Sequence, residues 1–566
     1  MLVCLLGFLL HGLNGFSQHL STLPNALEKS VDSIFSDEGW KMPDTPGIAF
    51  AIVRDGEVIY KKSFGASNLE HKVPITSKTR FNLGHTSTHF TAYAILKLVT
   101  EGKISLEEDI RGHLDPLQGF ADKVTVKDLL SGSSGIYDYT VLMPICGWGY
   151  TDNISQSDVL RLVSNQRKAA FMPGTDYAES DTNFILLAEL VAKLSGKSFK
   201  AYMEEEFFLP LGMKDTFIRT NARVKNPNVA RSYRTVEGKI LDNSSENEVF
   251  GIHNLYTTVD DLILWELHLR DAKSSNAKVI ELMEEPVALA NGRTHSTSMG
   301  DLTLGQLYGH KERGAFSTYV IGSWGGHDSS IFKFPNQEYT AIALSNDGNG
   351  YNGYTGVIAA HRVLKEHFTE PETVDFSKIK TKTLSNRKLE EFEGQYWDPL
   401  GELSRELKVV NDTLRYIRGP ENSTPLIPLD DHRFQMKVQF DDKVYVIFPK
   451  DRSGTMLYEY AGAEPIPFER YVPHSYSSKE IKDRFSGTYI NKAYGIVFKA
   501  KESETGLMLS NAKIGELNYD AVKPNLFLGG SWFMRSIEFV EENDNRITGF
   551  YVKNNAIRNL WFEKIE

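Results

Sequence analysis

The chain has 566 residues, of which 41% are hydrophobic, and it carries a formal net charge of −11. A single hydrophobic core stops growing at about 250–300 residues, so this length predicts two or three domains. An acidic chain has no basic field to attract phosphate backbones, and we therefore exclude nucleic acid as a partner.

The N-terminus resembles a secretory signal peptide in residues 1–17. An apolar run from Leu2 to Leu10 is followed by Gly15 and Ser17, small residues ahead of a cleavage point before Gln18. The run is too short to span a bilayer, and no later stretch reaches about 20 apolar residues. We expect a secreted or periplasmic protein with no membrane span; the alternative for this segment is a buried N-terminal helix.

Residues from about 46 to 346 combine strand and helix patterns. GIAFAIVRDGEVIYKKSFG alternates around Asp55-Gly56, a dipeptide typical of a tight turn between two strands. FTAYAILKLVTEGKIS and TNFILLAELVAKLSGKS have helical spacing and end at Gly102 and Gly196. SSIFKFPNQEYTAIALSN predicts another strand pair. This order predicts an α+β fold, with an antiparallel sheet closed by its first and last strands and flanked by helices.

From about residue 370 the sequence has short alternating aromatic and aliphatic runs, broken by Gly, Asn and Asp, which are typical of all-β structure. FEGQY at 392–396 returns as FSGTY at 485–489, a shift of 93 residues. At the same shift Leu414 coincides with Leu507, Tyr416 with Leu509, Leu429 with Val522, and Phe434 with Phe527. We expect two copies of one small β-barrel, in residues 385–472 and 478–566.

Six segments of the front part carry a resemblance to a known family. They are FNLGHTSTHFTAYAILKLVTEGKISLEEDI, VTVKDLLSGSSGIYDY, FMPGTDYAESDTNFILLAELVAKLSGKSF, LPLGMKDT, GIHNLYTTVDDLILWE and GSWGGHDSSIFKFPNQEYTAIALSN. In order and spacing they resemble the landmarks of class C β-lactamases, penicillin-binding proteins and related serine hydrolases. The resemblance spans about residues 45–365 and implies a β-lactamase-like domain in residues 18–370. The two barrels are similar to the C-terminal barrels of some D-aminopeptidases of this family.

The resemblance also implies where the family's acyl-transfer chemistry would lie. Its first landmark is S-x-x-K, in which the Ser attacks the substrate and the Lys on the same helical face draws away its proton. Aligned on Gly84 and the following Phe-Thr-Ala, these two positions hold His85 and Thr88. Ser87 is not a substitute, because two residues along an α-helix turn the side chain by about 200°, away from the cleft.

Two further landmarks of the family have also changed. In Y-x-N the Tyr shuttles protons and the Asn orients the acyl group, and the aligned positions hold Glu179 and Asp181. The His-x-Gly of the closing strand reads Val320-Ile321-Gly322. Loss of the nucleophile alone lowers the rate by about six orders of magnitude in comparable sites. The resemblance therefore predicts a chain without a working Ser-Lys-Tyr machinery.

The replaced residues predict a narrower and more acidic cleft than in the relatives. Ile252, His253 and Asn254 stand where relatives usually have small residues, and His327 and Asp328 follow the closing strand. The predicted ligand-binding residues are His85, Thr88, Glu179, Asp181, His253 and His327. Two carboxylates without a compensating Lys repel a carboxylate ligand, so we expect a cationic or neutral polar small molecule or peptide-like ligand.

Three interpretations of this cleft remain open. In the first, His85 forms a hydrogen bond with a carboxylate and fills a retired active site without a cofactor. In the second, His85 and His89, one helical turn apart, bind Zn²⁺ or another divalent metal together with Glu179 or Asp181. In the third, His85 performs acid–base catalysis with one of these carboxylates and no covalent intermediate.

Three classes of function follow from these interpretations. The favoured hypothesis is an exported, non-catalytic pseudoenzyme of the serine hydrolase family that binds a ligand in the inherited cleft. The first alternative is a hydrolase or lyase with a rebuilt His/Glu/Asp site, with or without a metal. The second alternative assigns protein or glycan binding to the barrels, with the front domain as support.

Overall fold

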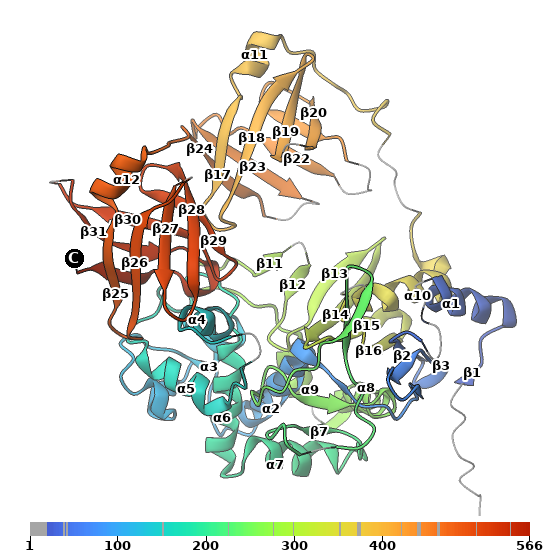
Figure 1. Cartoon of the computed structure of the whole chain (residues 1–566). Coiled ribbons are helices and arrows are strands. Elements are labelled where there is room, and N and C mark those ends of the chain that lie inside the picture. Colours follow the sequence, from blue (N-terminus) through green and yellow to red (C-terminus); the bar gives the residue numbers. More distant parts are fainter. Residues whose placement is uncertain are drawn as a thin grey trace, which may run out of the picture.

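The computed structural model describes residues 20–565, except 38–39, 41–43, 150–151, 225, 276, 298, 350–351, 371–374, 420, 439–442, 461–463, 505 and 544. The predicted signal peptide, residues 1–17, lies outside the described residues. Figure 1 shows a mixed helix and sheet domain followed by two barrels. In the part of the chain that the structure describes, no helix has the length and apolar character needed to cross a membrane.

A nine-stranded antiparallel sheet forms the centre of the first domain, as the sequence predicts. In spatial order its strands are β1 (Leu20–Ser21), β3 (Glu57–Phe64), β2 (Ile48–Arg54), β16 (Tyr339–Ser345), β15 (His327–Phe334), β14 (Ala315–Trp324), β13 (Tyr308–Glu312), β12 (Gly300–Leu302) and β11 (Ser296–Thr297). The first hairpin and the last strand meet in the β2–β16 pair. Asp55 and Gly56, with φ of 53° and 81°, make the turn between β2 and β3, which confirms the predicted hairpin.

Helices cover both faces of this sheet, so its strands are buried on both sides (Figure 1). Because strand side chains alternate, Phe50 and Ile52 pack with α1 (Asn25–Asp37) and α10 (Thr355–Val363). Ala49 and Ala51 point to the opposite face and pack with α2 (Ser87–Thr100), α6 (Thr182–Ser195) and α8 (Val259–Ser275). The predicted helices end at Gly102 and Gly196, both with a positive φ, because glycine adopts this conformation without strain.

The remaining elements of this domain surround the helices. They are β4 (Ala66–Asn68), β5 (Val73–Pro74), β6 (Phe81–Asn82), α3 (Val126–Leu130), α4 (Tyr139–Ile145), α5 (Gln156–Asn165), α7 (Phe199–Met203), β7 (Phe217–Ile218), β8 (Tyr233–Val236), β9 (Lys239–Asp242), β10 (Leu255–Thr257) and α9 (Ala277–Glu284). The strands β6, β10 and β7 form a separate three-stranded sheet beside α2. A short 3₁₀ turn, η1 (Gly84–Thr86), joins β6 to α2.

A close approach between η1 and β14 fixes the entrance to α2. A Cβ atom on Gly322 of β14 would lie 2.3 Å from the Thr86 backbone nitrogen and 2.4 Å from the Leu83 carbonyl oxygen. The Ser329 hydroxyl on the next strand donates to the same Leu83 carbonyl at 2.7 Å. Only glycine fits at position 322, and the end of β14 therefore lies directly against His85.

The rest of the chain forms two closed eight-stranded barrels, which confirms the two predicted β-barrel units. The first contains β17 (Gly394–Asp398), β18 (Leu403–Val410), β19 (Thr413–Gly419), β20 (Asn422–Pro428), β21 (Arg433–Met436), β22 (Val444–Ile447), β23 (Thr455–Tyr460) and β24 (Ile466–Tyr471). The second contains β25 (Gly487–Asn491), β26 (Ile496–Glu502), β27 (Leu507–Asn511), β28 (Gly515–Lys523), β29 (Leu526–Ser531), β30 (Met534–Glu541), β31 (Ile547–Val552) and β32 (Leu560–Lys564). A short helix precedes each barrel, α11 (Asn386–Glu390) and α12 (Ser478–Arg484).

One buried hydrogen bond demonstrates that the two barrels are copies of one design. The Tyr396 hydroxyl donates to the Phe392 carbonyl at 2.9 Å, and the Tyr489 hydroxyl donates to the Phe485 carbonyl at 2.7 Å. These residues are the FEGQY and FSGTY motifs, so the same shift of 93 residues relates the contacts. The sequence repeat therefore has a structural cause, a tyrosine that ties the first strand to the turn before it.

The second barrel docks onto the first domain through α4. Leu142 and Ile145 of α4 lie in the hydrophobic cluster of the barrel interior, and Figure 1 shows α4 directly beneath this barrel. The backbone N–H of Asp138 donates to the Ala556 carbonyl at 3.0 Å. The Arg558 guanidinium forms an ion pair with Asp176. The barrel is thus attached to the segments that precede α4 and α6.

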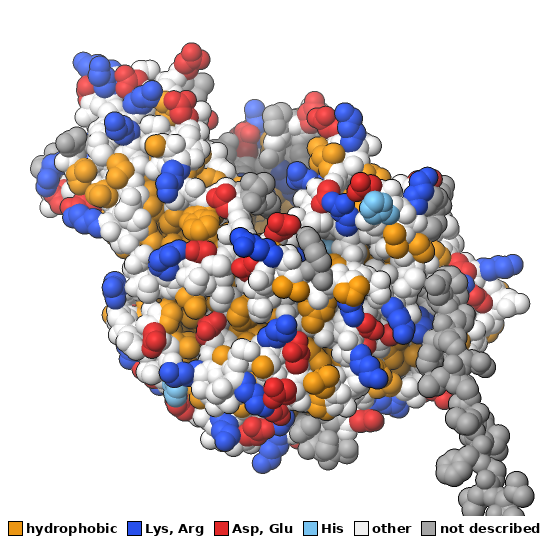
Figure 2. All heavy atoms as spheres, turned by 60° about the horizontal axis from the view of Figure 1, so that its bottom comes forward, with side chains coloured by type: hydrophobic (Ala, Val, Ile, Leu, Met, Phe, Trp, Pro, Cys, Tyr) orange, Lys and Arg blue, Asp and Glu red, His pale blue; other side chains and the backbone are white. Residues whose placement is uncertain are grey.

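Basic and acidic side chains are interspersed on the face of the molecule drawn in Figure 2. Neighbouring charges of opposite sign cancel within about one Debye length, roughly 8 Å at physiological ionic strength. This face therefore presents no field of a single sign.

The barrel-to-barrel contact predicts a measurable pH dependence of stability. Glu402 lies in the turn between β17 and β18 and is 6% exposed. Burial raises the pKa of its carboxyl from 4.5 to about 8. Ser536, Arg535 and Lys553 of the second barrel lower this pKa, but by less than burial raises it. Between pH 4.5 and about 8 the Glu402 carboxyl is ionised in the unfolded chain but still protonated in the native state. The free energy of unfolding therefore falls as the pH rises through this range. We expect Glu402→Gln to raise the melting temperature relative to wild type more at pH 9 than at pH 5.

Thermal melts at both pH values provide the measurement. Glu421→Gln, at an exposed site on the same barrel, is the matched control and should show no such difference. An equal effect of Glu402→Gln at both pH values would contradict the prediction.

Candidate functional site

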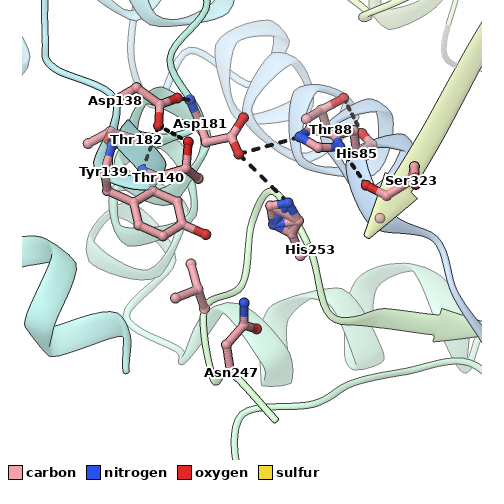
Figure 3. Close-up of polar contacts among 12 residues, drawn as sticks. His85, Thr88, Asp138, Tyr139, Thr140, Asp181, Thr182, Asn247, His253 and Ser323 are labelled. Carbon is pink, nitrogen blue, oxygen red and sulfur yellow. Dashed lines mark hydrogen bonds and ion pairs between the residues drawn. The ribbon is translucent and has the colours of Figure 1, made fainter. Parts of the chain in front are cut away.

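His85 lies in η1 at the entrance to α2, where it contacts both the sheet and α6 (Figure 3). Its Nδ1 is 2.9 Å from the carbonyl oxygen of Ser323, at the end of β14. Its Nε2 is 3.4 Å from Oδ2 of Asp181, and the side chain is 43% exposed. Both ring nitrogens are therefore engaged, while one side of the ring faces solvent.

Asp181 is the residue that joins the site. It occupies the N-cap of α6, but its carboxylate accepts no hydrogen bond from that helix. The same Oδ2 that contacts His85 lies 3.7 Å from Nε2 of His253. The backbone N–H of Asp181 donates to Oδ2 of Asp138 at 2.8 Å, which holds the start of α6 in place. Figure 3 shows the Asp181 carboxylate directed toward both imidazoles.

His253 is completely buried, with 0% exposure, in the turn before β10. Its ring lies 3.7 Å from the Trp324 ring and 4.7 Å from the His85 ring, measured between centroids. Neither of its ring nitrogens has a hydrogen-bond partner among the described residues. Burying an imidazole without a hydrogen bond is unfavourable, so this residue is not explained by packing alone.

The turn that carries His253 is rigid for local reasons. Asn254 has a φ of 64°, which asparagine tolerates better than most residues. Its side-chain amide donates to the Asn247 side chain at 2.7 Å and to the Val249 carbonyl at 2.9 Å. A Cβ on Gly251 would lie 2.4 Å from the Phe184 carbonyl of α6, so the turn packs directly against that helix. The position of His253 relative to Asp181 is therefore fixed by backbone contacts.

The charges of the cluster are strongly coupled. Burial lowers the pKa of His85, but the neighbouring Asp181 carboxylate outweighs burial and raises this pKa to about 9. Burial raises the pKa of Asp181, while His85 lowers it by more, so that the net pKa is lowered. Burial and the nearby His85 hold the pKa of His253 well below its ordinary value. At neutral pH the site thus contains an imidazolium–carboxylate pair beside a neutral histidine.

Asp138 is a further carboxyl group next to the His85–Asp181 pair. Its Oδ1 accepts the Thr140 backbone N–H at 2.6 Å, and it caps α4. Burial and the charge of Asp181 raise the pKa of Asp138 to about 7. The Asp138 carboxylate accepts the Asp181 backbone N–H, and the Asp138 backbone N–H donates to the second barrel. Asp138 therefore links the barrel to the cluster.

The hydroxyl groups near His85 are turned into the protein. Thr88 of α2 donates its hydroxyl to the carbonyl of His85, in the preceding 3₁₀ turn, at 2.8 Å. Ser87 is 2% exposed, and its hydroxyl has no partner among the described residues. Neither side chain faces the solvent beside His85.

Glu179 lies two residues before Asp181, in the segment that leads into α6. It is exposed and has no hydrogen-bond or ion-pair partner in the described part of the chain. Burial of its carboxyl and the charge of Asp181 raise its pKa, and His85 partly offsets this. Burial raises the pKa of the Tyr177 and Tyr308 phenols, and the nearby Glu179 charge raises both further. An acidic group near aromatic side chains is suited to a cationic ligand group.

The structure brings together His85, Glu179, Asp181 and His253 from the predicted set, but not the other members. His89 contacts the Gly305 carbonyl through Nδ1 at 2.8 Å and packs against Trp265, inside the protein. His327 is 4% exposed and packs against Phe81, under the small sheet. Val320 is buried in the core of the domain and forms no part of the cluster.

Three contributors to the site were not predicted from the sequence: Asp138, Ser323 and Trp324. Ser323 acts through its backbone carbonyl, which no side-chain pattern reveals. Asp138 had a usable signal, because an acidic residue directly before an apolar run is a typical helix N-cap. That signal predicts a cap and does not indicate proximity to Asp181.

The fold and these landmarks define a serine hydrolase-type domain, and comparison with known proteins agrees. The Beta-lactamase family model matches residues 35–360, more than half of the chain. The chain belongs to the β-lactamase family, which confirms the resemblance noted from the sequence.

Known relatives and solved structures extend this assignment. The D-aminopeptidase of Brucella anthropi is 25% identical over 247 residues, which are 44% of this chain and 47% of the relative. The match thus spans about half the length of these curated relatives. The octameric penicillin-binding protein homologue from Pyrococcus abyssi superposes with a TM-score of 0.53 at 23% identity, over 78% of this chain and 99% of its own. The crystal structure of SurE gives 0.51 at 18% identity, over 79% of this chain and 99% of its own. At these identities the solved structures demonstrate the fold.

The coupling between His85 and Asp181 predicts a specific change in titration. In chelator-treated protein, Asp181→Asn removes the negative charge that raises the His85 pKa, and burial then dominates. We expect the pKa of His85 to fall from about 9 to the ordinary histidine value of about 6.5 or below.

NMR titration of histidine-labelled protein measures this change, with His85→Gln to assign the signal. Glu179→Gln is the matched control, because the Glu179 charge contributes less to the His85 pKa than Asp181 does. A His85 pKa near 9 in Asp181→Asn would show that another group holds the proton.

Proposed function

We propose that this chain is an exported member of the β-lactamase family that binds a ligand in its cleft without acyl transfer. The observation that supports this most directly is the placement of His85. It stands at the entrance of α2, where the family resemblance puts the attacking serine, and its ring nitrogens are engaged by the Ser323 carbonyl and Asp181.

The position of the proton-accepting lysine supports the same conclusion. Thr88 stands there, and its hydroxyl donates to the His85 carbonyl. Ser87 is the nearest hydroxyl in sequence, but it is buried and 2% exposed. A serine needs an adjacent base and access to the substrate to act as a nucleophile, and Ser87 has neither exposure nor a hydrogen-bonded base among the described residues.

The charge at the mouth of the cleft favours a ligand with a free amino group. Glu179 is exposed and unpaired within the described residues, and it lies beside Tyr177 and Tyr308. A carboxylate with neighbouring aromatic rings attracts an ammonium group and repels a carboxylate. The similarity to D-aminopeptidases is compatible with a peptide-like ligand that presents its amino end to Glu179.

A second candidate function places binding at the barrels. A cavity of about 270 Å³ lies between them, lined by Trp397, Glu402, Lys553 and Arg558 among others. Its walls combine an aromatic ring with charges of both signs, a combination suited to a polar protein segment or a glycan. Binding at this cavity would leave the first domain as a support for the barrels.

Binding of a short peptide tests the favoured function. We expect a dipeptide amide with a free amino end to bind and to be recovered intact after prolonged incubation. Glu179→Gln should weaken binding about tenfold, since loss of one charged contact of about 1.4 kcal/mol changes the affinity by this factor. Isothermal titration and mass spectrometry of the peptide supply the two readouts.

The N-acetylated peptide is the matched ligand control and should bind as weakly to wild type as the free peptide binds to Glu179→Gln. Cleavage of the peptide would contradict the absence of catalysis. Equal binding to wild type and Glu179→Gln, with loss of binding in Trp397→Ala, would favour the barrel cavity instead.

A further inference from the structure

We propose that His85, Asp181 and His253 form a binding site for a divalent transition metal of the Zn²⁺ type. Each residue offers one ligand atom, and these three atoms all lie within 4.8 Å of one another. The inference goes beyond ligand binding at Glu179 and does not depend on it. It also changes the metal set predicted from the sequence, because His253 takes the place of His89 and Glu179.

The spacing of the ligand atoms agrees with metal coordination. Four ligands at about 2.0–2.1 Å from a tetrahedral zinc ion are separated from one another by roughly 3.3–3.4 Å. Here Oδ2 of Asp181 is 3.4 Å from Nε2 of His85 and 3.7 Å from Nε2 of His253. The three atoms are as close as, or slightly farther apart than, the ligands of a formed tetrahedral site, and binding of an ion would draw them together.

His253 gives an independent reason to expect a metal. Its side chain is 0% exposed, and neither ring nitrogen has a hydrogen-bond partner among the described residues. Buried polar groups in native proteins are normally satisfied, because an unpaired group loses the hydrogen bonds that it makes to water in the unfolded chain. A metal at the point where Nε2 faces Asp181 would satisfy this nitrogen.

The surrounding contacts orient the ligands as in known metal sites. Metal-binding histidines usually donate their second ring N–H to a carbonyl or carboxylate, which fixes the tautomer. His85 does this through Nδ1, 2.9 Å from the Ser323 carbonyl, so that Nε2, which lies 3.4 Å from Asp181, is the nitrogen that binds a metal in exchange for its proton. The backbone bond from Asp181 to Asp138 at 2.8 Å and the Trp324 ring 3.7 Å from His253 restrain the other two ligands.

The ligand types define the class of metal. Two imidazoles and one carboxylate match catalytic zinc sites, which keep a fourth position open, and also the facial triad of non-haem iron. Hard ions such as Mg²⁺ and Ca²⁺ prefer oxygen ligands, so two nitrogens disfavour them. His85 is 43% exposed, so water or a polar ligand can reach this part of the site.

Zinc titration of the full-length protein tests this site. After removal of metals by dialysis against a chelator, Zn²⁺ is added in competition with a chromogenic indicator. We expect one equivalent to bind to wild type, and both His253→Gln and His85→Gln to weaken binding by roughly 100-fold or more. Zinc K-edge absorption spectroscopy should detect two imidazole ligands in the wild-type complex.

Two controls keep the outcome interpretable. His361→Gln removes a histidine that lies 2.8 Å from Glu312 outside the cleft, and it should bind zinc as wild type does. His85 is partly exposed, so His85→Gln tests the site even where His253→Gln disturbs folding. Absence of zinc binding to wild type, or equal binding by wild type and His85→Gln, would overturn the proposal; neither result bears on peptide binding at Glu179.

Discussion

The contact of one carboxylate with two imidazoles is the interaction on which the site depends. Oδ2 of Asp181 lies 3.4 Å from His85 and 3.7 Å from His253. These three residues come from η1, from the start of α6 and from the turn before β10, which are distant in sequence. The close packing at Gly322 and Gly251 brings the three segments within reach of each other. A larger residue at either glycine would separate them before any polar contact could form.

The same cluster balances the charges of the side chains at the entrance of α2 and the start of α6. A buried charge is tolerated when a partner of opposite sign and further hydrogen bonds compensate it. His85 compensates Asp181, and the Ser323 carbonyl satisfies the far side of the His85 ring. Asp138 accepts the Asp181 backbone N–H and donates its own backbone N–H to the Ala556 carbonyl of the second barrel. The cleft and the barrel are thus mechanically connected through α4.

Much of the fold could be predicted from the sequence because its signals are local. The Asp55-Gly56 turn, the glycine stops at 102 and 196 and the repeated FEGQY and FSGTY motifs each depend on a few adjacent residues. The pairing of β2 with β16 required the additional rule that the first and last strands close such a sheet. His85, Glu179 and Asp181 were also predicted to lie together, because the family resemblance fixes their positions in the fold.

The composition of the cluster was harder to predict, for definite physical reasons. His85 and His89 are four residues apart, a spacing that puts side chains on one face of an α-helix. However, His85 lies in a 3₁₀ turn and α2 begins only at Ser87, so the two rings diverge and His89 contacts Gly305 instead. His253 is directed at Asp181 by the backbone of its turn, which depends on the left-handed Asn254 and on contacts with α6. No spacing rule in the sequence describes such a turn.

Reaction of the pure protein with a fluorophosphonate probe, followed by mass spectrometry of the peptides, tests the central claim most directly. The claim is that an imidazole paired with Asp181 has replaced the attacking alcohol in this cleft. It predicts that no serine at the entrance of α2 or α6 becomes labelled, even at high probe concentration and neutral pH. Stoichiometric labelling of Ser87 or Ser180, abolished by the corresponding Ser→Ala variant, would contradict it.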